Sequence, residues 1–233
     1  MAYKSSKETQ ERKDLKKKHI IHTAIKVFSA SGYHNTTVKE VVEAADISVG
    51  TFYFYFKNKE DLFAIVYDEV SEAFYETLCN AFQNFDNQID LGFGKAIAFF
   101  LKVIDLNKPL AKIMLIESVG LNPTFEQKRT EVTQQFVDYT AGYFNQMKAS
   151  EQIDIPNVKI CALAFIGTLY NVIMEWLQNS NAGRLTDAAY SLTIYNLQAL
   201  RVNYNALNIE KCIEEIICTD LSLLNISVEL PKE

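Results

Sequence analysis

Residues 36–59 read TTVKEVVEAADISVGTFYFYFKNK, and this stretch decides the fold. Thr37 followed three residues later by Glu40 is a capping-box pattern, and apolar residues then recur at helical spacing. Asp46 tolerates the positive φ that a tight turn often needs, and Ser48 can cap a second helix. The stretch therefore predicts two short helices joined by a tight turn.

The run TFYFYF, residues 51–56, is the ambiguous part of this stretch. Aromatic residues and Thr are strand formers, so the run taken alone favours a β-strand. The cap at Ser48, and the spacing of four that puts Phe52 and Phe56 on one helical face, favour a helix instead. The three aromatic residues between them then point partly outward, which suits contact with a phosphate backbone. The alternative is that all of them belong to the core.

At these residues the chain resembles the TetR family of bacterial transcriptional regulators. The resemblance covers residues 32–63, GYHNTTVKEVVEAADISVGTFYFYFKNKEDLF, where TTV, the S-x-G-T-F-Y run and F-x-x-K-E-x-L fall in register. Asp46 departs from the family, which usually has Gly there, and this bears only on how easily the turn forms. The resemblance implies an N-terminal three-helix DNA-binding domain, and a larger helical body that binds an effector and dimerises.

The resemblance also implies which side chains meet DNA. Those expected to hold phosphates are Thr37, Ser48, Thr51, Tyr53, Tyr55, Lys57 and Lys59. Lys39, Val49 and Gly50 are expected near base edges. Val49 can offer a thymine methyl group only an apolar contact, so specificity would rest on Lys39, DNA shape and aromatic packing.

Composition supports an all-α fold. The chain has 233 residues, 48% of them hydrophobic, with only 8 Gly and 4 Pro to interrupt helices. We expect a DNA-binding domain with an N-terminal arm at residues 1–60 and an effector-binding and dimerisation domain at residues 61–233. The net charge of −6 argues against a nucleic-acid partner. Residues 1–60, however, carry 11 Lys+Arg against 7 Asp+Glu, so a basic head precedes an acidic body.

The N-terminus is polar and charged, and residues 1–14 are expected to lack fixed structure in isolation. Seven Lys and Arg residues lie between positions 4 and 18. They either lie along DNA phosphates or form an ordinary solvated tail. The segment lacks the apolar region of a secretory signal, and no apolar run approaches the roughly 20 residues of a membrane helix. Together with four cysteines in no disulfide or zinc pattern, this predicts a cytoplasmic protein without a membrane partner.

Helical periodicity, caps and breakers predict the other helices. The first ends at Gly32, and a fourth runs from the cap at Asn58 to about Phe85. The remaining helices are expected at about 92–106, 108–120, 123–149, 157–179, 185–204 and 208–225, followed by a frayed tail to Glu233.

No catalytic motif is recognisable. Nucleophile elbows, H-E-x-x-H, phosphate loops and dinucleotide fingerprints are absent, and GFGK at residues 92–95 is too short to be a phosphate loop. His19 and His22 are three apart on one helix, but no further ligand completes a metal site. The sequence therefore predicts a protein that is not an enzyme and has no metal or cofactor.

Ligand binding is implied by the resemblance, because TetR-like bodies enclose a mostly apolar pocket among their middle helices. The candidate lining residues are Phe99, Phe100, Ile104, Met114, Glu117, Phe136, Tyr139, Tyr143 and Tyr170. They would suit a small apolar or aromatic effector, and they can equally fill a solid core. Glu117 and Glu175 each lie in an apolar stretch, and each is a cavity contact, an interface ion pair or a solvent-facing residue.

The segment 159–177 is apolar nearly all round, which predicts burial on every side. It is either a central core helix or one shared between the core and a subunit interface. The resemblance favours the second, since the family dimerises through its last long helices. The candidate anchors are Phe165, Leu169, Val172, Trp176, Leu192 and Tyr195, and the alternative is that they face the protomer core.

Our leading hypothesis is a homodimeric, sequence-specific transcriptional regulator, most simply a repressor released by a small apolar or aromatic effector. Two recognition helices would enter successive major grooves of a near-palindromic double-stranded operator, roughly 34 Å apart. Two alternatives stay open. One is a helical enzyme or ligand carrier whose head binds protein, and the other is a DNA binder without an effector.

Overall fold

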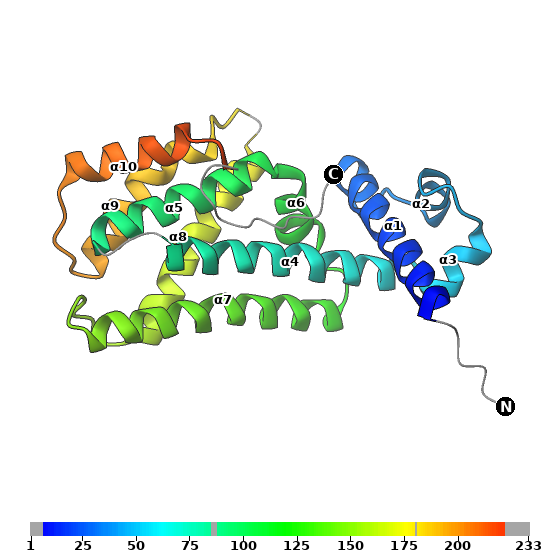
Figure 1. The fold of residues 1–233 in the computed structure, drawn as a ribbon, viewed down its shortest axis with the longest axis horizontal. Helices are drawn as coiled ribbons and strands as arrows, with labels where there is room; N and C mark the ends of the chain where they lie inside the picture. The colour runs from blue at the N-terminus through cyan, green and yellow to red at the C-terminus, as the bar shows by residue number, and fades with distance from the viewer. Residues whose placement is uncertain (1–6, 85–87, 180, 222–233) are drawn as a thin grey trace.

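The structure is a computed structural model, and it describes residues 7–84, 88–179 and 181–221. These residues form helices and contain no β-strand, which confirms the all-α prediction. A small head of three helices stands at one end of an elongated helical body (Figure 1). The head comprises α1 (Lys7–Ser31), α2 (Val38–Ala44) and α3 (Val49–Tyr55).

Short-range hydrogen bonds form the helix-turn-helix of the head. The Thr37 hydroxyl accepts from the Glu40 amide at 3.2 Å, and the Glu40 carboxylate accepts from the Thr37 amide at 2.7 Å. Asp46 takes the turn at φ 50°, and the Ser48 hydroxyl accepts from the Thr51 amide at 3.0 Å. Both caps and the turn agree with the sequence, and the strand alternative for residues 51–56 is wrong.

The head core explains how the aromatic run is divided. Phe52 and Phe56 are buried in the core with their ring centroids 5.5 Å apart, as their spacing of four predicts. Tyr53 and Phe54 are 55% and 66% exposed, while Tyr55 is half-buried. Phe52 and Phe56 therefore belong to the core of the head, whereas Tyr53 and Phe54 lie on its surface.

The prediction for the N-terminus is wrong in part, because α1 already begins at Lys7. Residues 7–14 extend a helix that is nucleated by the buried residues Ile20 to Phe28, and most are good helix formers. An exposed side-chain bond from Gln10 to Asp14, at 3.0 Å, spans one turn of this extension. Residues 1–6 lie outside the described residues.

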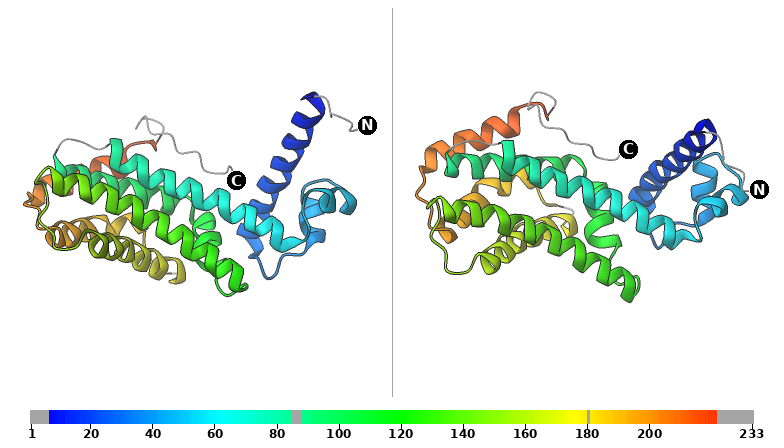
Figure 2. Two further views of the ribbon diagram at one scale, coloured as in Figure 1. Left: turned by 90° about the horizontal axis from the view of Figure 1, so that it is seen from below. Right: turned by 60° about the horizontal axis from the view of Figure 1, so that its bottom comes forward.

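The body is built around α4 (Lys59–Asn84), which leaves the head and runs along the body (Figures 1 and 2). Its neighbours are α5 (Ile89–Leu106), α6 (Lys108–Lys112) with a π-helical turn η1 (Ile113–Glu117), α7 (Pro123–Ala149) and α8 (Val158–Gln178). A 3₁₀ turn η2 (Leu185–Ala188), α9 (Ala189–Ala199) and α10 (Ala206–Cys218) complete it. Both α9 and α10 pack on α5.

Three of the expected helices differ from the observed ones. The stretch 108–120 is a short α-helix, a π turn and an irregular turn rather than one helix. The stretch 185–204 ends its helix at Ala199, since Arg201 takes φ 58°. The last helix starts at Ala206 and ends at Cys218. The expected frayed tail from residue 222 onward, and the fourth helix's expected end at Phe85, lie outside the described residues.

Aromatic stacking joins the head to the body. Phe63 in the first turns of α4 lies 5.2 Å from Phe28 of α1 and 4.5 Å from Tyr33, measured between ring centroids. On its other side Phe63 stacks on Phe125 of α7 at 5.6 Å. The N-terminal end of α4 therefore belongs to both cores, close to the boundary expected between residues 60 and 61.

Candidate nucleic-acid interface and ligand cavity

The exposed side of α3 is the candidate reading surface. Val49 is 51% exposed, and Gly50 and Tyr53 are also exposed. Lys39 on α2 is exposed and pairs loosely with Glu43 at 3.6 Å. A helix-turn-helix places its second helix in the major groove with N-terminal residues at the base edges. The geometry leaves Val49 and Gly50 free for such a contact.

The hydroxyls of Thr37, Ser48 and Thr51, which are expected to hold phosphates, already form hydrogen bonds at the N-caps of α2 and α3. The Ser48 hydroxyl, which accepts from the Thr51 amide, also shares a hydrogen bond with the Thr51 hydroxyl at 2.9 Å. The Thr37 hydroxyl donates to Glu40 at 2.9 Å. Thr37 and Ser48 remain exposed, as does Lys57. Phosphate contact by these hydroxyls stays a prediction.

Lys59 has a different environment from the one expected. Its Nζ donates to the carbonyl oxygens of Tyr33 and Thr36, each at 2.7 Å, and lies 4.2 Å from the centroid of the Tyr33 ring. Burial lowers the pKa of Lys59, while the nearby Glu40 carboxylate raises it. The ammonium thus binds the loop between α1 and α2, and its expected contact with a phosphate stays a prediction.

A basic groove lies between the N-terminal half of α1 and the end of α3. Its lining residues are Thr9, Arg12, Lys13, Leu15, Lys16, His19 and Tyr55. Lys13 Nζ stands 5.4 Å from the centroid of the Phe54 ring, which connects α1 to α3 at this point. His19 Nε2 is 3.1 Å from the Ala45 carbonyl oxygen, and no group of metal-ligating side chains is found among the described residues. The groove adds positive charge beside the candidate reading surface.

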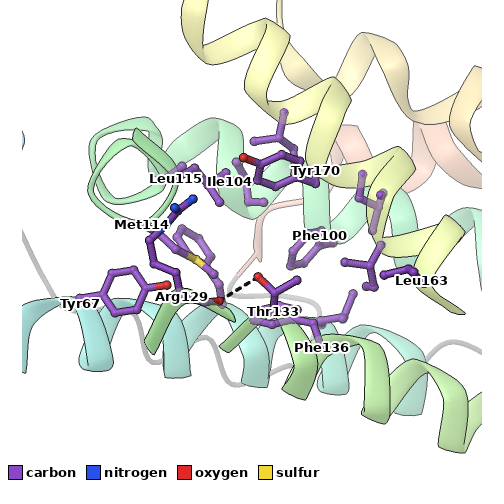
Figure 3. Close-up of a pocket in the computed structure, with 17 residues that line it drawn as sticks. Tyr67, Phe100, Ile104, Met114, Leu115, Arg129, Thr133, Phe136, Leu163 and Tyr170 are labelled. Atoms are coloured by element: carbon purple, nitrogen blue, oxygen red, sulfur yellow. Dashed lines mark hydrogen bonds between the residues drawn. The ribbon is translucent and has the colours of Figure 1, made fainter. Parts of the chain in front are cut away.

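A cavity of about 260 Å³ lies in the body among α4, α5, the α6–η1 segment, α7 and α8 (Figure 3). Its walls are mostly apolar, and five of the predicted lining residues are there: Phe100, Ile104, Met114, Phe136 and Tyr170. The other lining residues are Tyr67, Phe74, Leu78, Ala111, Leu115, Arg129, Thr133, Leu163, Ile166, Gly167, Leu169 and Ile173.

The remaining predicted cavity residues lie elsewhere. Phe99 is fully buried, Tyr139 donates to the Cys79 carbonyl at 3.0 Å, and Tyr143 packs on Phe82 at 5.0 Å. Glu117 accepts a hydrogen bond from the Tyr33 amide at 2.8 Å and is absent from the cavity wall. Glu175 faces solvent.

The α4 residues of the cavity were missed, because the apolar face of a long helix looks the same whether it packs or lines a space. Tyr67, Phe74 and Leu78 recur at helical spacing, as core residues also do. Their cavity role follows only from how the body helices are arranged around them. The sequence holds no local signal for it.

Three side chains give the apolar cavity a polar side. Arg129 donates to Glu126 at 2.8 Å, and Thr133 donates to the Arg129 carbonyl at 3.0 Å (Figure 3). Burial raises the pKa of Tyr67 to about 12, against smaller lowering effects of Ser71 and Arg129. At neutral pH the site therefore offers a guanidinium that is already paired with Glu126 and a neutral phenol, and it can hold an apolar chain with a polar, hydrogen-bonding group at one end.

Four of the predicted interface anchors are buried inside the protomer, so they are corrected to core residues. Phe165 packs on Phe93 at 5.4 Å, Leu169 lines the cavity, and Trp176 donates its indole N–H to the Gly183 carbonyl at 2.9 Å. Leu192 is also buried, whereas Val172 is half-buried and Tyr195 is 60% exposed.

α8 and α9 expose several apolar and aromatic residues. These are Ile160, Leu163 and Tyr170 on α8, and Tyr190 and Tyr195 on α9. By length and composition alone α8 could cross a membrane, which corrects the expectation that no segment reaches that length. It packs on α7 and α9 in the body, and core helices of other proteins pass the same test.

Comparison with known proteins agrees with this geometry. Residues 20–66 match the model of bacterial regulatory proteins of the tetR family. The chain is 26% identical to the fatty acid metabolism regulator protein of Bacillus subtilis over 164 residues, which are 69% of this chain and 82% of that protein. The relatives found are regulators rather than enzymes.

Solved structures share the fold. The transcriptional regulator FadR from Bacillus subtilis, in complex with stearoyl-CoA, superposes with a TM-score of 0.68 and 22% identity over 76% of this chain and 96% of that one. The fatty acid degradation regulator FadR from Bacillus halodurans superposes with a TM-score of 0.70 and 22% identity, over 81% of this chain and 97% of that one.

Proposed function

Because the chain belongs to the TetR family of bacterial transcriptional regulators, we propose that it is a homodimeric repressor which a long-chain acyl effector releases from its operator. It works in the cytoplasm on a near-palindromic site, with one head per half-site. The observation that carries the effector class is an apolar cavity with Arg129 and Tyr67 on its polar side.

DNA is bound by the head. α3 enters the major groove with Val49 and Gly50 at base edges, and Lys39 supplies the exposed cation of α2. Tyr53 and Lys57, both exposed, meet phosphates. The basic half of α1 adds sequence-independent affinity by counterion release.

The dimer forms through α8 and α9. Ile160, Leu163 and Tyr195 are apolar or aromatic side chains left exposed on neighbouring helices, and covering them with a second copy removes them from water. An interface between identical faces also gives the two-fold arrangement that a palindromic operator needs.

The acyl effector is supported by the cavity and by the relatives together. The B. subtilis relative is named for fatty acid metabolism, and a structural neighbour holds stearoyl-CoA. The apolar wall suits an acyl chain, and Arg129 suits its thioester or phosphate end. A volume of about 260 Å³ lies just below the roughly 300–1,000 Å³ of ligand pockets, so a long chain requires the cavity to widen.

The test uses DNA fragments selected by the purified protein and measures their affinity by fluorescence anisotropy. We expect stearoyl-CoA to release the DNA and coenzyme A alone to leave it bound. Each shortening of the acyl chain by two buried methylenes should weaken the effector roughly 15-fold, at ~0.8 kcal/mol per methylene. Release by coenzyme A alone, or no dependence on chain length, would refute an acyl effector, while failure to select any DNA would refute the regulator.

A further inference from the structure

Glu117 is a body residue that holds part of the head. Its Oε2 accepts from the Tyr33 backbone amide at 2.8 Å, across 84 positions of sequence. Gly32, just before, has φ +76°, and a Cβ at that position would stand 2.9 Å from the same carboxylate. A side chain at position 32 would therefore be strained by the positive φ and would displace the Glu117 carboxylate, which fits closely against the end of α1.

The loop between α1 and α2 is held from both sides. Glu117 accepts a hydrogen bond from the Tyr33 amide, and Lys59 on α4 donates hydrogen bonds to the carbonyl oxygens of Tyr33 and Thr36. The loop ends at Thr37, the N-cap of α2. Displacement of either side chain would therefore shift the N-terminus of α2, where the helix-turn-helix begins.

Glu117 closes the π-helical turn, and the same turn forms part of the cavity wall through Met114 and Leu115. The Ser118 hydroxyl, fully buried, donates to the Met114 carbonyl at 2.6 Å. In an α-helix that carbonyl would accept from the Ser118 amide, so the hydroxyl stands in for the missing bond. Such π turns are rare and concentrate at functional sites.

Return of the π turn to α-helical register would move Glu117 by one residue. One residue of an α-helix is a rotation of about 100° and a rise of about 1.5 Å. The carboxylate could then no longer reach the Tyr33 amide at hydrogen-bonding distance.

We propose that Glu117 reports the filling of the cavity to the DNA-binding head: a ligand pressing on Met114 and Leu115 changes the register of the π turn and withdraws the carboxylate from Tyr33. This inference rests on the proposed function for the roles of cavity and head. The intact contact, here called the Glu117 clasp, holds the head in its DNA-competent position.

The contact is suited to release. A carboxylate bound to an amide is a charge-assisted hydrogen bond, yet it sits at the C-terminal end of α1, where the helix dipole is negative and opposes it. Breaking it therefore requires only a modest free energy. Allosteric couplings generally amount to about 5- to 150-fold in affinity, which one such contact can supply.

The experiment fills the cavity by mutation and needs no effector. Ile173 on α8 lines the cavity and is buried, so Ile173→Phe adds volume inside it without touching the exposed face of α8. Operator affinity is measured for the unchanged protein, Ile173→Phe, Glu117→Ala and the double variant. Phe136→Trp enlarges a buried side chain of the cavity wall on α7 and is a second probe, in case the substitution on α8 disturbs the fold.

We expect each filling substitution to weaken operator binding about tenfold when Glu117 is present and less than twofold in the Glu117→Ala background. Glu117→Ala alone should already weaken binding, while Glu117→Gln, which keeps an acceptor oxygen, should retain most of the response. Glu210→Ala removes an exposed carboxylate on α10 and is the matched control.

Amide hydrogen exchange of the peptide that contains residues 32–36 gives a second readout. Exchange should be faster in Glu117→Ala and in Ile173→Phe than in the unchanged protein. Equal weakening by the filling substitutions in both backgrounds, no effect of filling on operator affinity, or unchanged exchange in Glu117→Ala would each overturn the proposal. Because no effector is used, a failure of stearoyl-CoA to release DNA leaves this result intact.

Discussion

Replacement of Lys59 by alanine separates two roles that a lysine beside a helix-turn-helix can have. The sequence favours a phosphate contact, whereas the structure directs the ammonium to the carbonyls of Tyr33 and Thr36 and to the Tyr33 ring. If the internal role holds, the substitution should destabilise the head and leave the salt dependence of DNA binding unchanged.

The magnitude follows from the three contacts. Hydrogen bonds from a charged donor contribute roughly 1.5–3 kcal/mol each, and we take the low end because Lys59 is only half-buried. The cation–π contact adds about 0.5 kcal/mol. Alanine recovers roughly 1.5 kcal/mol of side-chain entropy that the ordered lysine loses. The expected loss of unfolding free energy is therefore about 2 kcal/mol.

Urea unfolding and the salt dependence of operator affinity are the two measurements. Lys57→Ala is the matched control, because Lys57 is an exposed cation two residues away. We expect Lys57→Ala to keep its stability and to reduce the slope of log affinity against log salt by about 0.9. Lys59→Ala should instead lower the free energy of unfolding and leave the salt slope unchanged. A reduced slope with unchanged stability in Lys59→Ala would refute the internal role.

Three further predictions concern the cavity, the dimer and the cap. Arg129→Leu should weaken stearoyl-CoA binding about tenfold or more, through loss of a charged hydrogen-bond donor, and isothermal titration would reveal an unaffected affinity if Arg129 faces no ligand. Tyr195→Asp places a charge on the exposed face of α9 and should shift light scattering toward the monomer; an unchanged dimer would move the interface elsewhere. Hydrogen bonds from the backbone amide and hydroxyl of Thr37 lower the pKa of Glu40, so this cap is complete above the ordinary Glu pKa and is lost as pH falls through the lower folded value. Protection of the α2 amides, taken as exchange relative to the intrinsic rate at each pH, should fall in acid for the unchanged protein, and Glu40→Gln should flatten that dependence.

The head was predictable because its determinants are close in sequence. The capping box of Thr37 and Glu40, the cap at Ser48 and the spacing of Phe52 and Phe56 each act within one or two turns. The N-terminal extension of α1 was not predicted, because its polar residues carry no apolar period. They are helical by propagation from the packed part of the same helix.

The interface and the cavity were harder, because a helix that is apolar all round does not indicate which side meets the core. Phe165 and Leu169 turned inward, while Ile160 and Leu163 on the same helix stayed exposed. Glu117 shows the limit most clearly. Its partner is 84 positions away, and an acidic residue in an apolar stretch gave no indication of the loop that it binds.

Two connections of different physical kinds join the cavity to the head. Phe63 and Tyr67 lie one turn apart on α4, and Phe125 of α7 contacts both rings, at 5.6 Å and 5.1 Å. Apolar burial is less sensitive to distance and angle than a hydrogen bond, so these contacts permit the head to tilt while the two cores remain in contact. The hydrogen bond from Tyr33 to Glu117 depends on distance and angle, and a change of helical register abolishes it. The aromatic stack is therefore suited to act as the hinge of the head, and the Glu117 clasp to decide which position the head takes.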